Sequence, residues 1–158
     1  MTTSPEAVKV IAEFEGDRLT PYNDLSGNAT EGVGHLMHAG PLAPGENQPE
    51  TLEKSLADFA EDLKAKAEKY IPFLVRVPLT QGQYDCLISF TFNLGCGTLQ
   101  HLVSVTGLNR RNYSAVPTAI LEYDKAHVNG QLVAVPGLTR RREWEVSLWG
   151  KNANSENG

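Results

Sequence analysis

The sequence contains few cysteines, no long apolar run and no excess of basic residues. Its two cysteines are too few for the disulfide framework of a small secreted protein. No stretch approaches the run of about eighteen apolar residues that a membrane-spanning helix needs. Lys and Arg number 14 against 19 Asp and Glu, which gives a net charge of −5. This acidic balance argues against a nucleic-acid-binding protein, because such binding depends on neutralising phosphate groups.

The two cysteines, Cys86 and Cys96, lie on or near one predicted helix. A helix rises about 1.5 Å per residue, so it would separate them by roughly 15 Å, beyond the reach of a disulfide. We expect two free thiols, with a redox switch as the alternative hypothesis. The N-terminus, MTTSPEAVKV, is neither a cationic leader nor an apolar anchor. We therefore expect a soluble monomer that is made in the cytoplasm, with no export signal and no membrane anchor.

The composition is that of a globular protein with an uneven charge. The 158 residues include 41% hydrophobic and 21% charged residues, enough for one domain or two small lobes. The net charge of Lys, Arg, Asp and Glu is −7 over residues 1–70 and +2 over residues 71–158. We expect an acidic front half and a mildly basic back half.

Local signals predict helices around a small sheet. Thr3, Ser4 and Pro5 begin a helix over residues 4–15, and Gly16 ends it. A small antiparallel sheet fits residues 19–38, with a turn near 26–28, and a Pro- and Gly-rich loop follows over 39–50. A long helix fits residues 51–70, ended by Pro72.

The second half of the chain is predicted to be mostly helical. Thr80 and Gln83 form a capping box ahead of an apolar helix that closes at Gly95. Helical patterns continue over 99–108, 116–125 and 139–149, and Asn129–Gly130 predicts a short β-hairpin between the last two. The polar tail from residue 151 should be frayed.

The segment from Glu15 to Thr30 concentrates groups suited to acid–base chemistry. Glu15 follows Val8 and Ile11 at helical spacing, so we expect partial desolvation that helps its carboxyl to keep a proton. Asp24 lies in a polar turn, where a carboxylate stays charged. Two carboxylates in such different settings suit the acid and the base of a glycosidase, with the Thr30 hydroxyl helping to hold a water. Spacing alone also allows ordinary surface residues.

Four stretches resemble the phage-type lysozymes (endolysins), glycoside hydrolase family 24. The first, EGDRLTPYNDLSGNATEGVGH at residues 15–35, has Glu15, Asp24 and Thr30 at the family's intervals. The others are VPLTQGQYD at 77–85, FNLG at 92–95 and PGLTRRREWE at 136–145. Together they span nearly the whole chain.

The resemblance implies an α+β fold that is lysozyme-like and mostly helical, in one catalytic domain of residues 1–158. A small N-terminal β-sheet lobe would cover about 16–55, and a connecting helix about 51–70. A helical lobe would cover about 71–150 together with the N-terminal helix 4–15, with the substrate cleft between the lobes.

The resemblance also implies a function. The family hydrolyses the β-1,4 bond between N-acetylmuramic acid and N-acetylglucosamine in bacterial peptidoglycan, without a cofactor. Glu15 would donate the proton, while Asp24 and Thr30 would place water or stabilise the developing charge. Further implied roles are substrate contacts at Gly34, Leu36, Phe92, Asn93 and Arg141, and a buried, pH-sensitive ion pair between His35 and Asp62. Release through a holin would bring the protein to the wall.

Some features depart from the family or leave alternatives open. Glu31 stands where the family usually has an apolar residue, and could lie harmlessly on the outer face or raise the pKa of its neighbours. His35 and His38 have no third metal ligand at a recognisable interval, so we expect no metal. Phe92 could belong to the core or to the saccharide site. The arginines 140–142 could grip carboxylates of the wall or pair with Glu143 and Glu145.

Three hypotheses follow. The first is hydrolysis by single displacement, with inversion implied by the family. The second is a lytic transglycosylase, in which one Glu acts as acid and base and the sugar closes an anhydro ring. The third is a peptidoglycan-binding module with an inactive site, suggested by Glu31 and the acidic surface.

Overall fold

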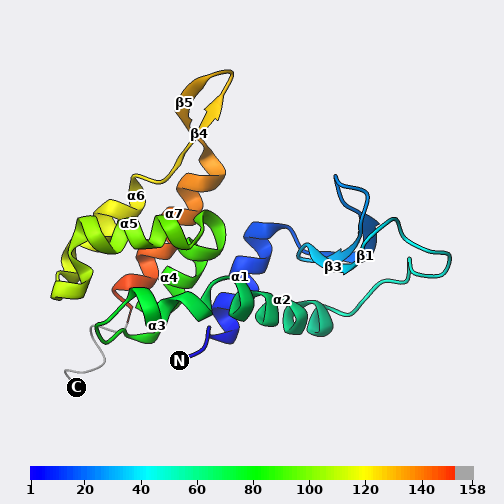
Figure 1. Cartoon of the computed structure of the whole chain (residues 1–158), viewed down its shortest axis with the longest axis horizontal. Helices are drawn as coiled ribbons and strands as arrows, with labels where there is room; N and C mark the ends of the chain where they lie inside the picture. The colour runs from blue at the N-terminus through cyan, green and yellow to red at the C-terminus, as the bar shows by residue number, and fades with distance from the viewer. Residues whose placement is uncertain (152–158) are drawn as a thin grey trace. The chain divides into compact units, whose positions relative to one another are not determined.

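The computed structural model describes residues 1–151, and the predicted frayed tail lies almost wholly outside them. The chain divides into two compact units: Ser4–Ala65, and a helical unit that begins at Lys66 and includes Met1–Thr3 (Figure 1). The N-terminal helix groups with the sheet, whereas the resemblance had assigned it to the helical lobe. The candidate residues Glu15, Asp24 and Thr30 therefore lie in one unit.

Helix α1 spans Pro5–Glu15, and its signals are local. The side chain of Ser4 accepts a hydrogen bond from the N–H of Ala7 at 3.2 Å, and Pro5 stands in the first turn, where its missing N–H costs nothing. Gly16, with φ 79°, ends the helix in the left-handed conformation that only glycine adopts without strain. These features confirm the predicted start and stop.

Three short strands follow α1 and form an antiparallel sheet in the order β1-β2-β3. Their bounds are Arg18–Asn23, Ala29–Gly32 and His35–His38. The register places Tyr22 opposite Thr30 across β1 and β2, and Leu36 opposite Thr30 across β2 and β3. Thr30 is thus held from both sides, on the middle strand.

The predicted single helix over residues 51–70 is wrong only over its last four residues, 67–70. Helix α2 spans Leu52–Lys66, the backbone leaves the helical region at Ala67, and a 3-10 turn η1 (Glu68–Tyr70) leads into α3 (Ile71–Leu74). Pro72 does not end a helix, because it stands in the first turn of α3. Periodicity continued through the break and concealed it.

The rest of the helical unit is built around α4, Gln81–Leu94, whose Thr80–Gln83 capping box is present as predicted. Helix α6 stops at Leu121, short of the predicted 125, because strand β4 of the hairpin begins at Lys125. Both turn residues of the hairpin, Asn129 and Gly130, have positive φ. This β4–β5 hairpin projects from the unit (Figure 1). The remaining bounds are α5 Cys96–Thr106, η2 Leu108–Arg110, η3 Tyr113–Ala115, α6 Val116–Leu121, β4 Lys125–Val128, β5 Gln131–Ala134 and α7 Pro136–Trp149.

Helix α4 is the core of this unit, and its residues from Tyr84 to Thr91 are all buried. Both cysteines are free. Cys86 is fully buried, and burial raises the pKa of its thiol well above the ordinary value. None of the helices within residues 1–151 has the length and apolar character needed to cross a membrane.

Replacing Gly82 with Ala should destabilise the protein by about 1–3 kcal/mol, because overpacking a tight contact forces the backbone to shift. A methyl group at this position of α4 would overlap the carbonyl oxygen of Leu148 on α7. Gly97→Ala is the matched control, since Gly97 also lies in the first turn of a helix but has open space around it. Urea unfolding measures both, and equal effects would contradict the packing argument.

Candidate functional site

Glu15 is the last residue of α1 and is exposed. The predicted desolvation by the apolar face of the helix is therefore wrong for this structure. Ile11, one turn earlier, is fully buried. At Glu15, however, the helix ends, and the chain turns away through Gly16, so no further turn covers the carboxyl.

Asp24 shapes the turn between β1 and β2. Its Oδ1 accepts hydrogen bonds from the backbone N–H groups of Ser26 and Asn28, each at 2.9 Å. The backbone closes the same turn, since the Asp24 N–H donates to the Asn28 carbonyl at 2.9 Å. Oδ2 receives no hydrogen bond from any residue that the structure describes. One oxygen thus fixes the carboxylate while the other is left for a ligand.

Thr30 lies on β2 and is only 3% exposed. Its hydroxyl donates a hydrogen bond to the Asn28 carbonyl at 3.0 Å. The hydroxyl proton is committed in this way, so the lone pairs of Oγ1 are available as acceptors. Asn28 therefore connects the two predicted residues: its N–H binds Asp24 and its carbonyl binds Thr30.

Two predicted substrate-contact residues lie nearby on the same sheet. Gly34, between β2 and β3, is exposed and has φ 66°, which favours glycine. Leu36 on β3 is 55% exposed although it is a large apolar residue. The Gly34 backbone and the Leu36 side chain are both accessible to a ligand.

His35 and Asp62 are brought together, but not in a buried pair. His35 Nδ1 lies 3.3 Å from Asp62 Oδ2, and the two side chains are 36% and 17% exposed. The two side chains are thus in contact, but the expectation that they are buried is wrong. The contact joins β3 to α2.

The other predicted contacts lie in the helical unit, where Arg141 and Asn93, but not Phe92, take part in a polar network. Arg141 is 4% exposed and donates to Ser89 Oγ and to the Ser89 carbonyl, both at 3.2 Å. Asn93 Oδ1 accepts from Arg142 Nη2 at 2.8 Å. Phe92 is half-buried, with Lys66 Nζ 5.8 Å from its ring centre. Of the two alternatives for the arginines, the structure favours pairing for positions 141 and 142.

Glu145 is at the centre of this network and has no solvent exposure. Its Oε1 accepts from Ser89 Oγ at 2.6 Å and from Arg142 Nη2 at 2.9 Å. Arg142 Nε lies 2.8 Å from Oε2, an ion pair whose angle does not make a hydrogen bond. Burial raises the pKa of Glu145, and the two guanidinium groups oppose that shift. Sequence analysis missed Ser89, which has no charge to mark it.

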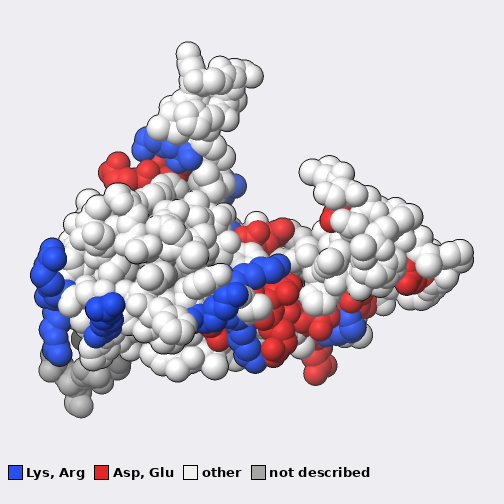
Figure 2. Space-filling model, viewed as in Figure 1, with Lys and Arg blue, Asp and Glu red and all other residues white. Residues whose placement is uncertain are grey.

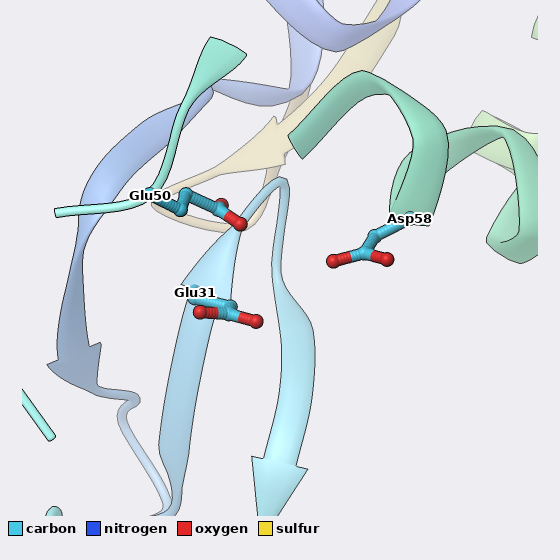
Figure 3. A group of neighbouring side chains, drawn as sticks. All are labelled: Glu31, Glu50 and Asp58. Atoms are coloured by element: carbon cyan, nitrogen blue, oxygen red, sulfur yellow. The ribbon is translucent and has the colours of Figure 1, made fainter. Parts of the chain in front are cut away.

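Glu31 is not a loose carboxylate beside the site. Its side chain is 14% exposed and lies 2.7 Å from Lys54 Nζ, which also contacts Glu50 at 3.1 Å and Asp58 at 2.9 Å. Figure 3 shows these three acids converging from β2, the segment before α2, and α2 itself. They lie close enough together to hold a cation, and the Lys54 ammonium fills that role. Hydrogen bonds to Asp58, Glu31 and Glu50 raise the pKa of Lys54.

Lys54→Met should lower the free energy of unfolding by about 1–2 kcal/mol. Each pair with the half-exposed Lys54 contributes about 0.2–1 kcal/mol, and three carboxylates would repel one another without it. Neighbours in a strand point to opposite faces, so Glu31 holds β2 from the face opposite Thr30. Hydrogen exchange of the β2 amides should therefore accelerate. Lys64→Met is the control, since Lys64 pairs with the exposed Glu61. Unchanged β2 exchange in Lys54→Met would contradict the anchoring role.

His38 and Glu46 should anchor the loop over residues 39–46 in a pH-dependent way. A hydrogen bond to the Ala39 carbonyl, then one to Glu46, raises the pKa of His38 above 6.5. The Ala43 N–H, then His38, lowers the pKa of Glu46 below 4.5. The contribution of His38 to the stability of the loop is full below pH 6.5 and is lost as the pH rises through its raised pKa. The Glu46 contribution is full above 4.5 and is lost as the pH falls through its lowered pKa.

The loop should therefore be most protected between about pH 4.5 and 6.5, where both groups are charged. Hydrogen exchange of residues 39–46, corrected for intrinsic rates, should be slower at about pH 5.5 than at about pH 8.5. Glu46→Gln should reduce this difference and leave the part that comes from the Ala39 bond. Equal protection at both pH values in the unmodified protein would refute it.

Comparison with known proteins places this geometry in a family. The phage lysozyme family model matches residues 12–145. The endolysin of Salmonella phage P22 is 36% identical over 142 residues, which cover 90% of this chain and 94% of that protein.

Solved structures agree with the sequence comparison. A crystal structure of a P22 lysozyme mutant superposes with a TM-score of 0.76 at 35% identity, covering 94% of this chain and 98% of that one. The muramidase domain of SpmX from Asticaccaulis excentricus gives a TM-score of 0.76 at 30% identity, covering 94% and 97%. The predicted α+β, lysozyme-like fold class is confirmed. The chain belongs to the phage lysozyme family.

Proposed function

We propose that this chain is an endo-acting muramidase that hydrolyses the β-1,4 bond between N-acetylmuramic acid and N-acetylglucosamine in peptidoglycan. The observation that carries the proposal is the joint placement of Asp24 and Thr30 on either side of Asn28. It leaves two acceptor atoms in one hairpin, Asp24 Oδ2 in the turn and Thr30 Oγ1 on β2. Relatives named endolysin and a neighbour named muramidase support the substrate class.

In this mechanism, Glu15 donates its proton to the oxygen of the leaving sugar as the glycosidic bond breaks. A water molecule that donates hydrogen bonds to Asp24 Oδ2 and Thr30 Oγ1 attacks the anomeric carbon and loses a proton to Asp24 Oδ2 as the new C–O bond forms. The charge of Asp24 stabilises the positive charge that develops on the sugar ring. Since Glu15 is exposed in the structure, the bound glycan itself must shield it from water during the reaction. Attack from the opposite face would invert the anomeric carbon.

The structure gives the other predicted contacts unequal support. Gly34 and Leu36 are accessible and lie on the same sheet as Thr30, so we retain both as glycan contacts. Arg141 and Asn93 are engaged in the network around Glu145. We propose that these two shape the helical unit and that Phe92 is the better candidate for contact with a sugar.

The test is to identify the products released from purified peptidoglycan by mass spectrometry after borohydride reduction. Muropeptides with a reduced muramic acid at their end are expected from a muramidase. Products lighter than the reduced muropeptides by one water and two hydrogens, with an anhydro ring that resists reduction, would establish the transglycosylase instead. A reduced glucosamine end would show that the other glycosidic bond is cut. Binding to the wall without any soluble product would establish the binding module.

We further propose that the protein acts as a monomer on the bacterial cell wall after release through a holin. Of these proposals, the relatives support only peptidoglycan as the partner. Sedimentation velocity tests the monomer. Co-expression with and without a holin tests the release, since lysis only in the presence of the holin is the expected result.

A further inference from the structure

The helical unit contains a pocket that none of the roles above uses. Its volume is about 340 Å³, within the range of small-molecule sites. It is formed by α3, by α5, and by the turn at Gly107 that leads into η2. The pocket combines apolar wall residues, Leu74 and Val103 among them, with two arginines, Arg76 and Arg110.

The two arginines lack carboxylate partners among the residues that the structure describes. Within residues 1–151, no ion pair or hydrogen bond engages either guanidinium group, and no acidic residue lines the pocket. The sequence contains no Asp or Glu from residue 86 to residue 121. At the lower left of the helical unit, Figure 2 shows blue areas separated by uncharged surface, with no red between them. A pocket with two unneutralised cations favours an anionic ligand.

The backbone that carries the arginines is tied together by Asn109. Its Oδ1 accepts from the backbone N–H of Arg76 at 2.7 Å, and its Nδ2 donates to the Leu74 carbonyl at 2.9 Å. The segment after α3 is thereby fixed to η2, which carries Arg110. Fixing the backbone segments that carry the two arginines lowers the entropy cost of ordering these segments when a ligand binds.

Phe73 adds an apolar surface to the pocket. It lines the pocket and is 75% exposed, which is unusual for a phenylalanine. The ligand that fits must therefore present a carboxylate next to small apolar groups. A phosphate-rich polymer would satisfy the arginines but leave the exposed Phe73 ring without an apolar contact.

We propose that this pocket binds the C-terminal carboxylate of an alanine-rich peptide stem of the bacterial cell wall. Arg76 and Arg110 bind the carboxylate, and Phe73 and Val103 pack against the alanine methyl groups. The choice of ligand rests on the proposed function, because peptidoglycan carries such peptides on the glycan. Residues 4–65 carry 4 basic against 12 acidic side chains, so the helical unit is the part of the chain whose charge suits an anionic wall.

The test is NMR titration with the synthetic peptide L-Ala-γ-D-Glu-L-Lys-D-Ala-D-Ala. Amide signals of residues 73–76 and 100–110 should shift. Arg110→Gln and, separately, amidation of the peptide C-terminus should each weaken binding about tenfold, as expected for loss of a charge-assisted hydrogen bond. Arg111→Gln is the matched control, since Arg111 is an exposed neighbour that does not line the pocket. It should change the affinity less than about twofold.

Shifts confined to other residues, or equal affinity for the amidated peptide, would overturn the proposal. So would concentration-dependent shifts of the same residues without peptide, because a second copy of the chain would then cover the pocket. The titration needs no turnover. Peptide binding by a protein that releases no glycan product would support the peptide site and contradict the muramidase proposal. Release of glycan products without peptide binding would support the muramidase and contradict the peptide site.

Discussion

Replacing Glu145 with Gln is expected to lower the free energy of unfolding by about 3–5 kcal/mol, which is the cost of leaving a buried charge without its partner. Arg142 and Glu145 both have no solvent exposure. Glu145 Oε1 accepts from Ser89 and Arg142, and Arg141 Nε lies 3.5 Å away. A neutral amide would leave the Arg142 guanidinium desolvated and facing no opposite charge. Thermal and urea unfolding measure the loss.

The chain offers a matched control for burial. Lys64 and Glu61 are also three residues apart on a helix and form an ion pair at 2.6 Å, but their side chains are 51% and 70% exposed. Glu61→Gln should change stability by less than about 0.5 kcal/mol. A double variant, Arg142→Met with Glu145→Leu, should recover much of the loss, because well-packed apolar residues often replace a buried pair without cost. A loss below 1 kcal/mol in Glu145→Gln would contradict the account of the network.

Local signals in the sequence predicted the elements whose causes are local. Ser4 and Gly16 bound α1, Thr80 and Gln83 begin α4, and Asn129–Gly130 makes the hairpin turn. Each depends on a hydrogen bond or a φ angle within a few residues. The break at Ala67 could not be predicted in this way, because the apolar spacing continues through it.

Side-chain environments were harder to predict than elements. Helical spacing suggested a shielded Glu15, yet the carboxyl is exposed because the helix ends there. Lys54 stands four residues from both Glu50 and Asp58, a spacing visible in the sequence, but Glu31 joins them only through the fold. Arg141 resembled a ligand contact by type and proved to be tied to Ser89, which no charge pattern marks.

Glu15→Gln is the second change with a large expected effect. The amide has nearly the shape of the carboxyl but cannot donate an acidic proton to a leaving oxygen. Loss of a general acid costs about 10²–10⁴-fold in rate. The free energy of unfolding is measured beside the activity, so that an effect of the substitution on folding is separated from its effect on the reaction. A large loss of activity in a folded protein then reports on chemistry alone.

Glu13 is the matched control for this experiment. It lies on α1 two residues before Glu15 and is also exposed, and only its backbone carbonyl takes part in the helix end, at 3.3 Å from the Gly16 N–H. Glu13→Gln makes the same chemical change at the same helix terminus. It should retain activity within about twofold, because it removes no reacting group.

The most direct measurement is the rate of reducing-end release from purified peptidoglycan by the unmodified protein, Glu13→Gln and Glu15→Gln, with folding of all three checked by circular dichroism. The rate of Glu15→Gln alone should fall at least about a hundredfold, as expected for a lost general acid. Full activity in folded Glu15→Gln would contradict the assignment of Glu15 as the proton donor.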